Sequence, residues 1–334
     1  MNKINLYMIA FAAVLSGSTF LVSCSDDDDS TSPSALTPTP TIVNNEGVAM
    51  RLSSVGSTTF TYDEEGKLTA FRFDGTNYTA SGDKLSFTGI YDDVTENIDI
   101  ALNGQGLISK VSVNHTEGSE DSEEWEKETM TVSFSYNSSN QLVGMKSSVV
   151  ESGYNSYEGS WSYNGSGNQT NTWTDGNLVS AIWKNNYSES YDGEKISSTS
   201  TSHYKISYGN TANTSKQYTY NIAEIATDGY YDEALALIGY FGVGTAYLPT
   251  GYSYEHNDTE YEENNETGNV SLSYSLNSDG TIYSESYDAL YSTIIYYNYV
   301  SSKASQALKV AKSVADNLRV SKHSKLRRHH KTAR

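Results

Sequence analysis

The chain has 334 residues, a formal net charge of −19 and a single cysteine. A lone cysteine excludes an intramolecular disulfide, so any folded part must be stabilised by burial and hydrogen bonding. The sequence also lacks an HExxH zinc motif, a GxSxG elbow and a complete glycine pattern for nucleotide binding. No cofactor, no resident metal and no catalytic residue are therefore expected.

The N-terminus predicts a lipoprotein signal peptide over residues 1–23. An apolar run from Ile4 to Phe20 follows Lys3, and the segment Leu21 to Cys24 resembles the lipobox read by the lipoprotein signal peptidase. An ordinary secretory signal and a short membrane anchor are the alternatives. The resemblance implies a diacylglyceryl group on the Cys24 thiol, cleavage before Cys24, and stable attachment to the membrane through acyl chains such as palmitate.

Residues 24–46 are predicted to be a tether. The run Ser25, Asp26, Asp27, Asp28 and Asp29 resembles the acidic export signal of surface lipoproteins in the Bacteroidota, which implies an outer-membrane protein exposed to the outside of the cell. The alternative is that these acids only keep the tether hydrated. Three of the four prolines of the chain follow within this segment, which favours an extended chain.

Residues 47–300 predict a mainly β domain built as a large antiparallel hairpin meander. The segments 62–68, 136–142 and 276–282 share one turn pattern, with Asp or Asn at the second position and Gly or Asn at the fifth. The first can bond the backbone two residues on, and the second tolerates the left-handed conformation. Shorter turns are expected at 102–107 and 173–178, and turns into strands at 82–85 and 192–196. Either a curved open sheet or a closed one is compatible with this pattern.

One short helix is expected near 229–242, with Asp228 as its N-cap and helical spacing from Tyr230 to Ile238. The hairpins, followed by the segment from Leu235 to Pro249, resemble a Bacteroidota surface lipoprotein family. That family is defined by a domain of unknown function with YD-type hairpin repeats. The resemblance covers roughly residues 50 to 300 and implies a β-rich surface lipoprotein without catalytic residues.

Two acidic clusters, Glu117 to Glu128 and Asp258 to Glu266, are interpreted as solvated hairpin loops. Paired carboxylates could also serve a glycan-active hydrolase, which would need two buried acids facing each other in a cleft. Weak calcium binding is the intermediate reading.

The aromatic residues offer a further hypothesis. The chain has 28 tyrosines, and four aromatic residues concentrate in one region: Trp161, Tyr163, Trp173 and Trp183. If exposed, they could form a flat platform for sugar rings or for a partner protein. The alternative is that they pair across strands and only stabilise the sheet.

Residues 301–334 differ sharply in composition, with ten Lys and Arg and one Asp. This segment is predicted to be a basic helical tail that contacts either anionic lipid or the acidic body of the protein itself. Nucleic-acid binding conflicts with the export signals. Taken together, the sequence predicts a non-enzymatic, lipid-anchored surface protein that binds a glycan or an envelope protein. The alternatives are a structural or adhesive envelope protein and a glycan-active hydrolase.

Overall fold

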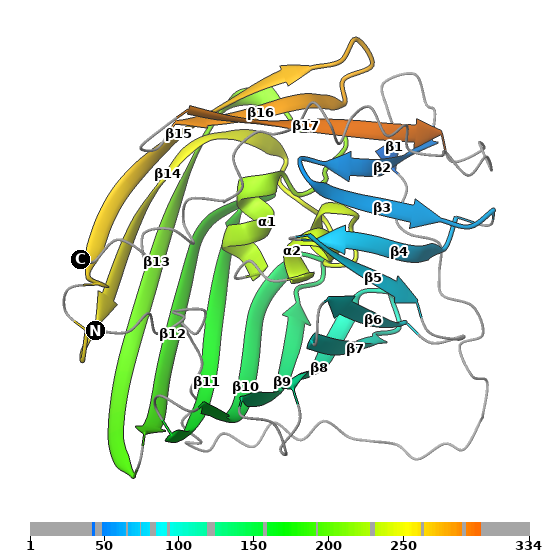
Figure 1. Ribbon diagram of the computed structural model, residues 1–334. Helices are drawn as coiled ribbons and strands as arrows, with labels where there is room; N and C mark the ends of the chain where they lie inside the picture. Colours follow the sequence, from blue (N-terminus) through cyan, green and yellow to red (C-terminus); the bar gives the residue numbers. More distant parts are fainter. Residues whose placement is uncertain are drawn as a thin grey trace.

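A computed structural model describes the fold (Figure 1). It describes residues 42–43, 49–64, 66–73, 75–80, 85–91, 94–118, 124–155, 159–191, 193–227, 231–261, 264–288 and 292–301. The predicted signal peptide, Cys24, the acidic run and nearly all of the basic tail lie outside these residues. The expected C-terminal helix therefore lies outside them too, apart from Ser301, which ends a strand.

Strands β2–β17 form a closed 16-stranded antiparallel barrel, and a short strand β1 pairs with β2 at its margin. The first strands are β1 (Ile42–Val43), β2 (Ala49–Val55), β3 (Thr58–Tyr62), β4 (Leu68–Phe73), β5 (Thr76–Ala80), β6 (Ser86–Tyr91), β7 (Val94–Leu102), β8 (Ile108–Gly118) and β9 (Trp125–Tyr136). The others are β10 (Leu142–Asn155), β11 (Gly159–Thr174), β12 (Asn177–Tyr191), β13 (Glu194–Ala212), β14 (Tyr247–Asp258), β15 (Glu266–Leu276), β16 (Ile282–Asp288) and β17 (Ser292–Ser301). Each strand from β2 on pairs with the next one in sequence, which confirms the predicted hairpin meander. The pairing of β17 with β2 closes it.

The turns have the geometry that their residues predict. The Asn137 side chain accepts hydrogen bonds from the backbone N–H groups of Ser139 and Gln141 at 2.9 and 3.0 Å. Asn140 follows in the left-handed region at φ 58°, and Gly66, Gly106 and Gly280 take the equivalent places at φ 83°, 78° and 82°. Each of these turns leads from an odd-numbered strand to the next even-numbered strand. Because successive strands run in opposite directions, all of these turns lie at the same end of the barrel.

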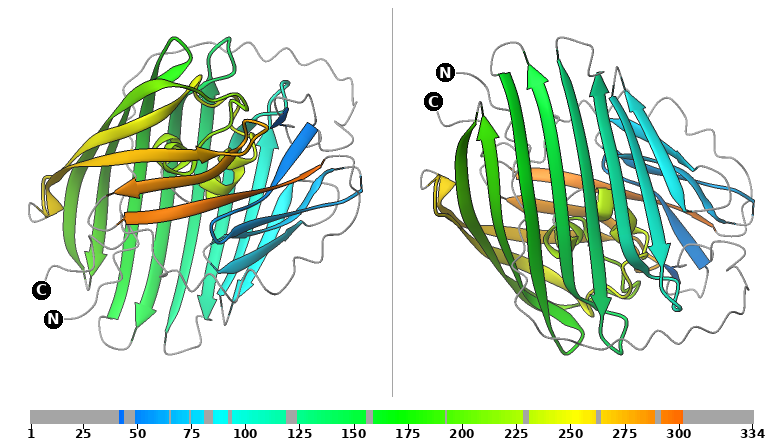
Figure 2. Two further views of the ribbon diagram at one scale, coloured as in Figure 1. Left: turned by 90° about the horizontal axis from the view of Figure 1, so that it is seen from above. Right: turned by 90° about the horizontal axis from the view of Figure 1, so that it is seen from below.

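Two helices lie inside the barrel: α1 (Tyr220–Thr227) and α2 (Tyr231–Leu237). Seen from above and below, they sit between the wall of β9–β13 and the opposite wall of the barrel (Figure 2). The segment that follows α2 docks on the turns, with Ile108 donating to the Tyr240 carbonyl at 3.0 Å and Val243 to the Asn140 carbonyl at 3.0 Å. We call this side the helix end of the barrel. Helix α2 lies within the predicted range 229–242, whereas α1 was not predicted.

Inward-facing side chains of the wall hold both ends of α1. Buried Glu285 of β16 accepts hydrogen bonds from the Tyr220 and Asn221 N–H groups at 2.9 and 3.4 Å, which satisfies the free donors of the helix N-terminus. At the other end, Gln169 Nε2 of β11 donates to the carbonyls of Ile225 and Ala226 at 2.8 and 3.1 Å. Helix α1 is therefore hydrogen-bonded to β16 at its N-terminus and to β11 at its C-terminus.

The two faces of the wall differ in polarity. Along β11 the inward positions include Trp161, Tyr163 and Trp173, while every outward one is Ser, Thr or Asn: Ser160, Ser162, Asn164, Ser166, Asn168, Thr170, Thr172 and Thr174. Ser, Thr and Lys also predominate on the outer faces of β9, β10 and β13, although β10 additionally exposes Val150 and Tyr154. The hydrophobic core lies inside, where buried wall residues pack with the two helices.

Candidate functional site

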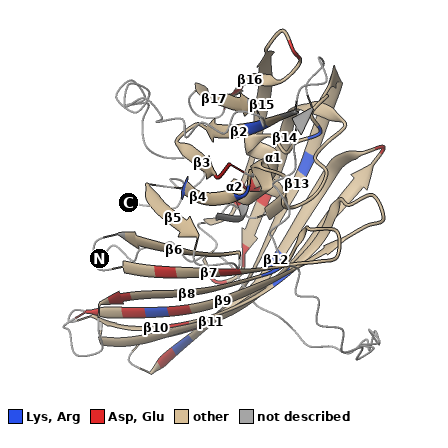
Figure 3. Cartoon of the chain, turned by 90° about the vertical axis from the view of Figure 1, so that its right-hand side faces the viewer, with Lys and Arg blue, Asp and Glu red and all other residues tan. Residues whose placement is uncertain are grey.

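The end of the barrel opposite the helix end carries a row of inward-facing polar residues, which we call the acidic row. Strand pairing places one residue from each of six neighbouring strands, β7 to β12, directly side by side: Glu96, His115, Glu128, Glu151, Tyr163 and Glu189. Asp and Glu on β7, β8 and β9 can be followed in Figure 3. We call this side the acidic end of the barrel.

The acidic row lies where the hydrophobic core stops. One step deeper, the paired inward residues are apolar and buried, namely Ile98, Val113, Met130 and Val149. One step toward the rim, the paired residues are Glu117, Glu126, Gly153, Trp161 and Tyr191. The row is therefore bounded by the core on one side, and on the other by a rim in which Glu117 is exposed, Glu126, Trp161 and Tyr191 are half-buried and Gly153 is buried.

Glutamates in direct cross-strand opposition repel each other and destabilise a sheet. Burial, and then the neighbouring charges of Glu126 and Glu128, raise the pKa of Glu151 to about 9. Burial, followed by the charges of Glu96 and Glu126, raises the pKa of Glu128 to about 7. Raised pKa values occur at functional sites and also at buried structural carboxyls, of which Glu285 is an example in this protein.

Hydrogen bonds satisfy the two outer members of the row. The Tyr78 hydroxyl donates to Glu96, and the hydroxyl groups of Tyr261 and Tyr191 donate to Glu189 at 2.8 and 3.2 Å. His115 Nε2 lies 3.8 Å from Glu126 Oε1 in the rim row. In contrast, Glu151 is only 2% exposed and its Oε2 has no hydrogen-bond partner among the described residues. The Glu151 side chain is hydrogen-bonded instead to the side chain of Glu126 in the rim row, so the centre of the row holds a carboxyl–carboxyl pair.

The four predicted aromatic residues do not form an exposed flat surface, since all of them point into the barrel. Tyr163 and Trp183 are buried, and Trp161 and Trp173 are half-buried. Trp161 and Tyr163 join the acidic end, and the Tyr163 ring stacks on Tyr187 with centroids 5.7 Å apart. Trp173 lies at the helix end, where its Nε1 donates to the Leu142 carbonyl at 2.8 Å.

The interpretation of the acidic clusters as solvated loops was wrong for several of their members. Glu126 and Glu128 belong to β9 and share the inward face with Met130, Val132 and Phe134. The inward direction of these two glutamates could have been predicted from the sequence, because alternate residues of a strand face the same side. Asp258 is also buried and accepts a hydrogen bond from Ser198 Oγ at 2.6 Å, which holds its pKa below the usual value despite burial.

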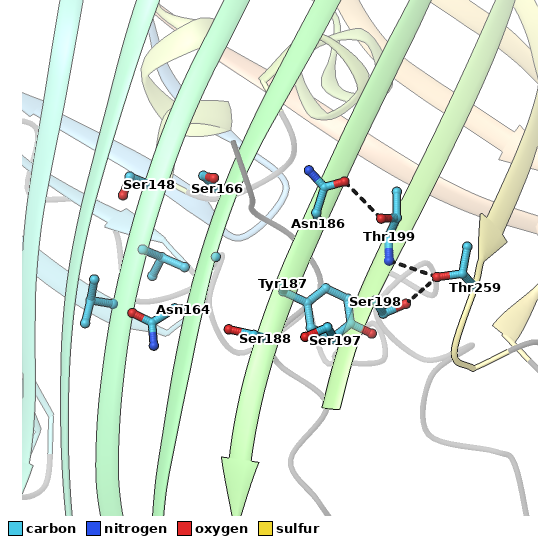
Figure 4. Close-up of a pocket in the computed structure, with 13 residues that line it drawn as sticks. Ser148, Asn164, Ser166, Asn186, Tyr187, Ser188, Ser197, Ser198, Thr199 and Thr259 are labelled. Atoms are coloured by element: carbon cyan, nitrogen blue, oxygen red, sulfur yellow. Dashed lines mark hydrogen bonds between the residues drawn. The ribbon is translucent and has the colours of Figure 1, made fainter. Parts of the chain in front are cut away.

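A second surface feature lies on the outer face of β10–β13, a shallow groove of about 600 Å³ (Figure 4). Its lining combines hydroxyl and amide side chains, among them Asn164, Ser188 and Ser197, with Val149 and Val150, and includes no charged residue. Asn186 accepts a hydrogen bond from Thr199 Oγ1 at 2.9 Å, and Thr259 Oγ1 accepts one from the Thr199 N–H at 3.0 Å. Such a lining can exchange hydrogen bonds with a neutral polar ligand.

Within the described ranges, no group of three or more His, Cys, Asp or Glu side chains is arranged to hold a metal ion. The members of the acidic row are spread along successive strands and do not converge on one point. In the same part of the chain, neither helix is long and apolar enough to cross a bilayer.

No family model matches the chain, and no curated protein sequence matches it either. Solved structures include a porin-like protein from Bacteroides vulgatus ATCC 8482, 13% identical, with a TM-score of 0.43, covering 74% of this chain and 98% of that one. Another is a porin-like protein from Bacteroides uniformis ATCC 8492, also 13% identical, with a TM-score of 0.22, covering 67% of this chain and 94% of that one. Similarity this low leaves the function to be argued from the chain's own residues.

Proposed function

We propose that this chain is a non-enzymatic lipoprotein of the outer membrane, anchored through Cys24, which holds its barrel outside the bilayer and binds a glycan or an envelope protein. The observation that carries this proposal is the polarity of the wall. A barrel that spans a membrane needs an apolar outer band about 25 Å tall and commonly has a polar interior. Here the outer positions of β11 are all Ser, Thr or Asn, and the core lies inside.

The direction of the strands supports an orientation for the anchored barrel. Ile42 of β1 and Ser301 of β17 both pair with Met50 of β2, at the helix end. The tether that leads from Cys24 therefore enters at the helix end, and the basic tail leaves from the same end. An acyl anchor and a polybasic segment are two membrane signals that reinforce each other. In this arrangement the acidic end points away from the membrane.

In this arrangement the basic tail begins on the membrane side, which favours contact with anionic headgroups over contact with the acidic row. Trp161 and Tyr163 are the aromatic part of the distal binding site, next to the carboxylates of the acidic row. Aromatic rings beside hydrogen-bonding polar groups suit the recognition of sugars and of partner proteins alike.

Fractionation of cells that express Cys24→Ala tests the anchor and the polarity argument together. We expect the wild-type protein in the outer-membrane fraction and the variant in the soluble envelope fraction. A variant that stays in the membrane after a high-salt wash would contradict the proposal, because it would mean that the barrel itself is embedded. Protease added to intact cells tests surface display, and protection of the wild-type protein would contradict it.

A glycan-active hydrolase is the second candidate, favoured by one observation. Glu128 and Glu151 are inward-facing neighbours on paired strands, so two acids do face each other. Retaining and inverting glycosidases, however, hold their two carboxyl groups on opposite sides of the scissile bond, at least about 5 Å apart. Release of reducing sugar from a polysaccharide panel by the wild-type protein, lost in Glu151→Gln, would establish this second candidate over the first.

A further inference from the structure

Strands β8–β13 carry their opposite charges on opposite faces of the barrel wall. All of the glutamates in these strands face the barrel interior, and no Asp or Glu lies on the outer face of the six strands, all of whose residues the structure describes. On the neighbouring strands, Asp99 of β7 and Glu255 of β14 face outward and bound this positive face. All of the lysines in these strands face outward and are exposed, namely Lys110, Lys127, Lys146, Lys184, Lys195 and Lys205.

Three of these lysines lie in one row across the strands, which we call the lysine line. Lys110 of β8 pairs with Ser133 of β9, which pairs with Lys146 of β10. Lys146 also pairs with Asn168 of β11, and Asn168 pairs with Lys184 of β12. Because adjacent strands are about 4.8 Å apart, successive lysines of the line are about 10 Å apart. None of the three lysines forms an ion pair with a described residue, so their charges are available to a ligand.

The neutral groove on the outer face of β10–β13 lies directly beside the lysine line (Figure 4). Two positions further along each strand toward the acidic end, the paired outward residues all line this groove, namely Ser148, Ser166, Asn186 and Thr199. Beyond the groove, Lys127 and Lys195 belong to the next row of lysines, in which they pair with Ser152 and Ser190. A ligand in the groove would therefore have hydroxyl and amide groups beneath it and cations on both sides.

We propose that the outer face of β8–β13 binds an acidic polysaccharide, with the lysine line on its acidic groups and the groove on its sugar hydroxyl groups. This inference rests on the proposed glycan-binding function, to which it adds a second site and a charge class. Alternate strands are separated by about the length of a disaccharide, so the lysines match a polymer with one acidic group on every second sugar.

The side chains between the lysines favour a polysaccharide over a lipid surface. Ser133 and Asn168 are exposed and polar, and they can exchange hydrogen bonds with sugar hydroxyl groups. A segment that lies on a membrane surface combines its cations with apolar side chains that enter the bilayer, and the lysine line has none. The acids of the inner face do little to repel a polyanion here. Glu151 lies five residues from Lys146 along β10, about 17 Å away, which exceeds the screening length of about 8 Å at physiological ionic strength.

The test is lysine footprinting of the full chain in non-ionic detergent, with hyaluronan as the probe because it carries one carboxylate per disaccharide. Mass spectrometry measures the rate of acetylation at each lysine with and without the polymer. We expect acetylation of Lys146 and Lys184 to slow by about threefold or more, since each ammonium group is covered by a carboxylate. Lys205 is the matched control, because it is an exposed lysine on the same face of β13 outside the line and the groove. Its rate should not change.

Affinities of variants give a second measurement on the same probe. Lys146→Gln and Lys184→Gln should each weaken hyaluronan binding by about threefold, and the double variant by about tenfold, because exposed ion pairs at separated positions are weak and nearly additive. Lys205→Gln should bind like the wild-type protein. Thermal melts of each variant establish that it is folded.

Three results would overturn the inference. No protection by hyaluronan, equal protection of Lys205, or protection confined to the basic residues of 301–334 would leave the lysine line without a role. Protection of Lys146 and Lys184 by dihexanoyl-phosphatidylglycerol, without protection by hyaluronan, would assign the face to an anionic lipid instead. Carboxyl-reduced hyaluronan, which is neutral, separates the two proposals. Binding of this polymer that is lost in Trp161→Ala and leaves the lysine line unprotected would keep the proposed glycan-binding function and reject the second site.

Discussion

The two ends of the barrel differ in the hydrogen bonding of their buried, inward-facing carboxyl groups. At the helix end, Glu285 is fully buried but accepts hydrogen bonds from the α1 N-terminus, from Asn221 Nδ2 at 2.9 Å and from the Tyr297 hydroxyl at 2.6 Å. At the acidic end, Glu151 is also buried, but it faces Glu128 and its side-chain hydrogen bond is to another acid, Glu126. A carboxyl group that accepts hydrogen bonds from neutral donors stabilises the fold, whereas neighbouring acids that repel each other weaken it.

The largest effect is expected from the core of the helix end. Phe241 is fully buried and packs edge-on against Phe134, with ring centroids 4.7 Å apart. Phe241→Ala should lower the free energy of unfolding by about 3–5 kcal/mol, measured by chemical denaturation. Ile90→Ala, at a position 67% exposed on the outer wall, is the control and should change it by less than about 0.5 kcal/mol. Similar losses in both variants would mean that the helix end is not the stable part.

Removal of the carboxylate that caps α1 comes next. Glu285→Ala leaves the Tyr220 and Asn221 N–H groups without their acceptor and should cost about 2–3 kcal/mol. Hydrogen exchange should show faster opening of α1 than of the β11–β12 pair. Unchanged protection of α1 would contradict the role assigned to Glu285.

At the acidic end we expect a substitution to raise the free energy of unfolding instead of lowering it. Glu151 is mainly protonated at pH 8, so the folded state holds a proton that the unfolded chain releases, which lowers its stability. Glu151→Gln removes that cost and should stabilise the protein by about 1 kcal/mol at pH 8. The pKa of Glu151 is raised from its usual value of 4.5 to about 9, so its favourable contribution is complete below about pH 4.5 and is lost as the pH rises toward 9. The melting temperature of the wild-type protein should therefore fall between pH 5 and 9, more steeply than that of Glu151→Gln. Parallel pH profiles would show that Glu151 is not the group responsible.

The smallest effect concerns a single turn at the helix end. Gly106 has φ 78°, whereas Gly104 in the same turn has ordinary φ and open space around its Cα. Gly106→Ala should lower the free energy of unfolding by about 1 kcal/mol, because a side chain is strained in the left-handed region. Gly104→Ala is the matched control and should be neutral or slightly stabilising in the same denaturation assay. Equal effects would remove the conformational argument for these turns.

Local patterns were sufficient for the strands, the turns and one of the two helices. Alternation of side chains and the placement of Asn137 and Asn140 determine hairpins without reference to the rest of the chain. Helix α1 could not be predicted from the sequence, because eight residues are too few to form a stable helix alone. It exists because Glu285 and Gln169 hold its two ends from opposite walls.

The sequence by itself therefore determined the antiparallel meander and its turns, and it predicts the anchor at Cys24, because each of these depends on residues close together in the chain. Only the tertiary structure decided that β17 pairs with β2, that the predicted aromatics point inward, and that Glu96, Glu128, Glu151 and Glu189 share one row. The physical reason is register. Side-chain parity is a local property of each strand, but which residues lie side by side is determined only when all of the strands are paired.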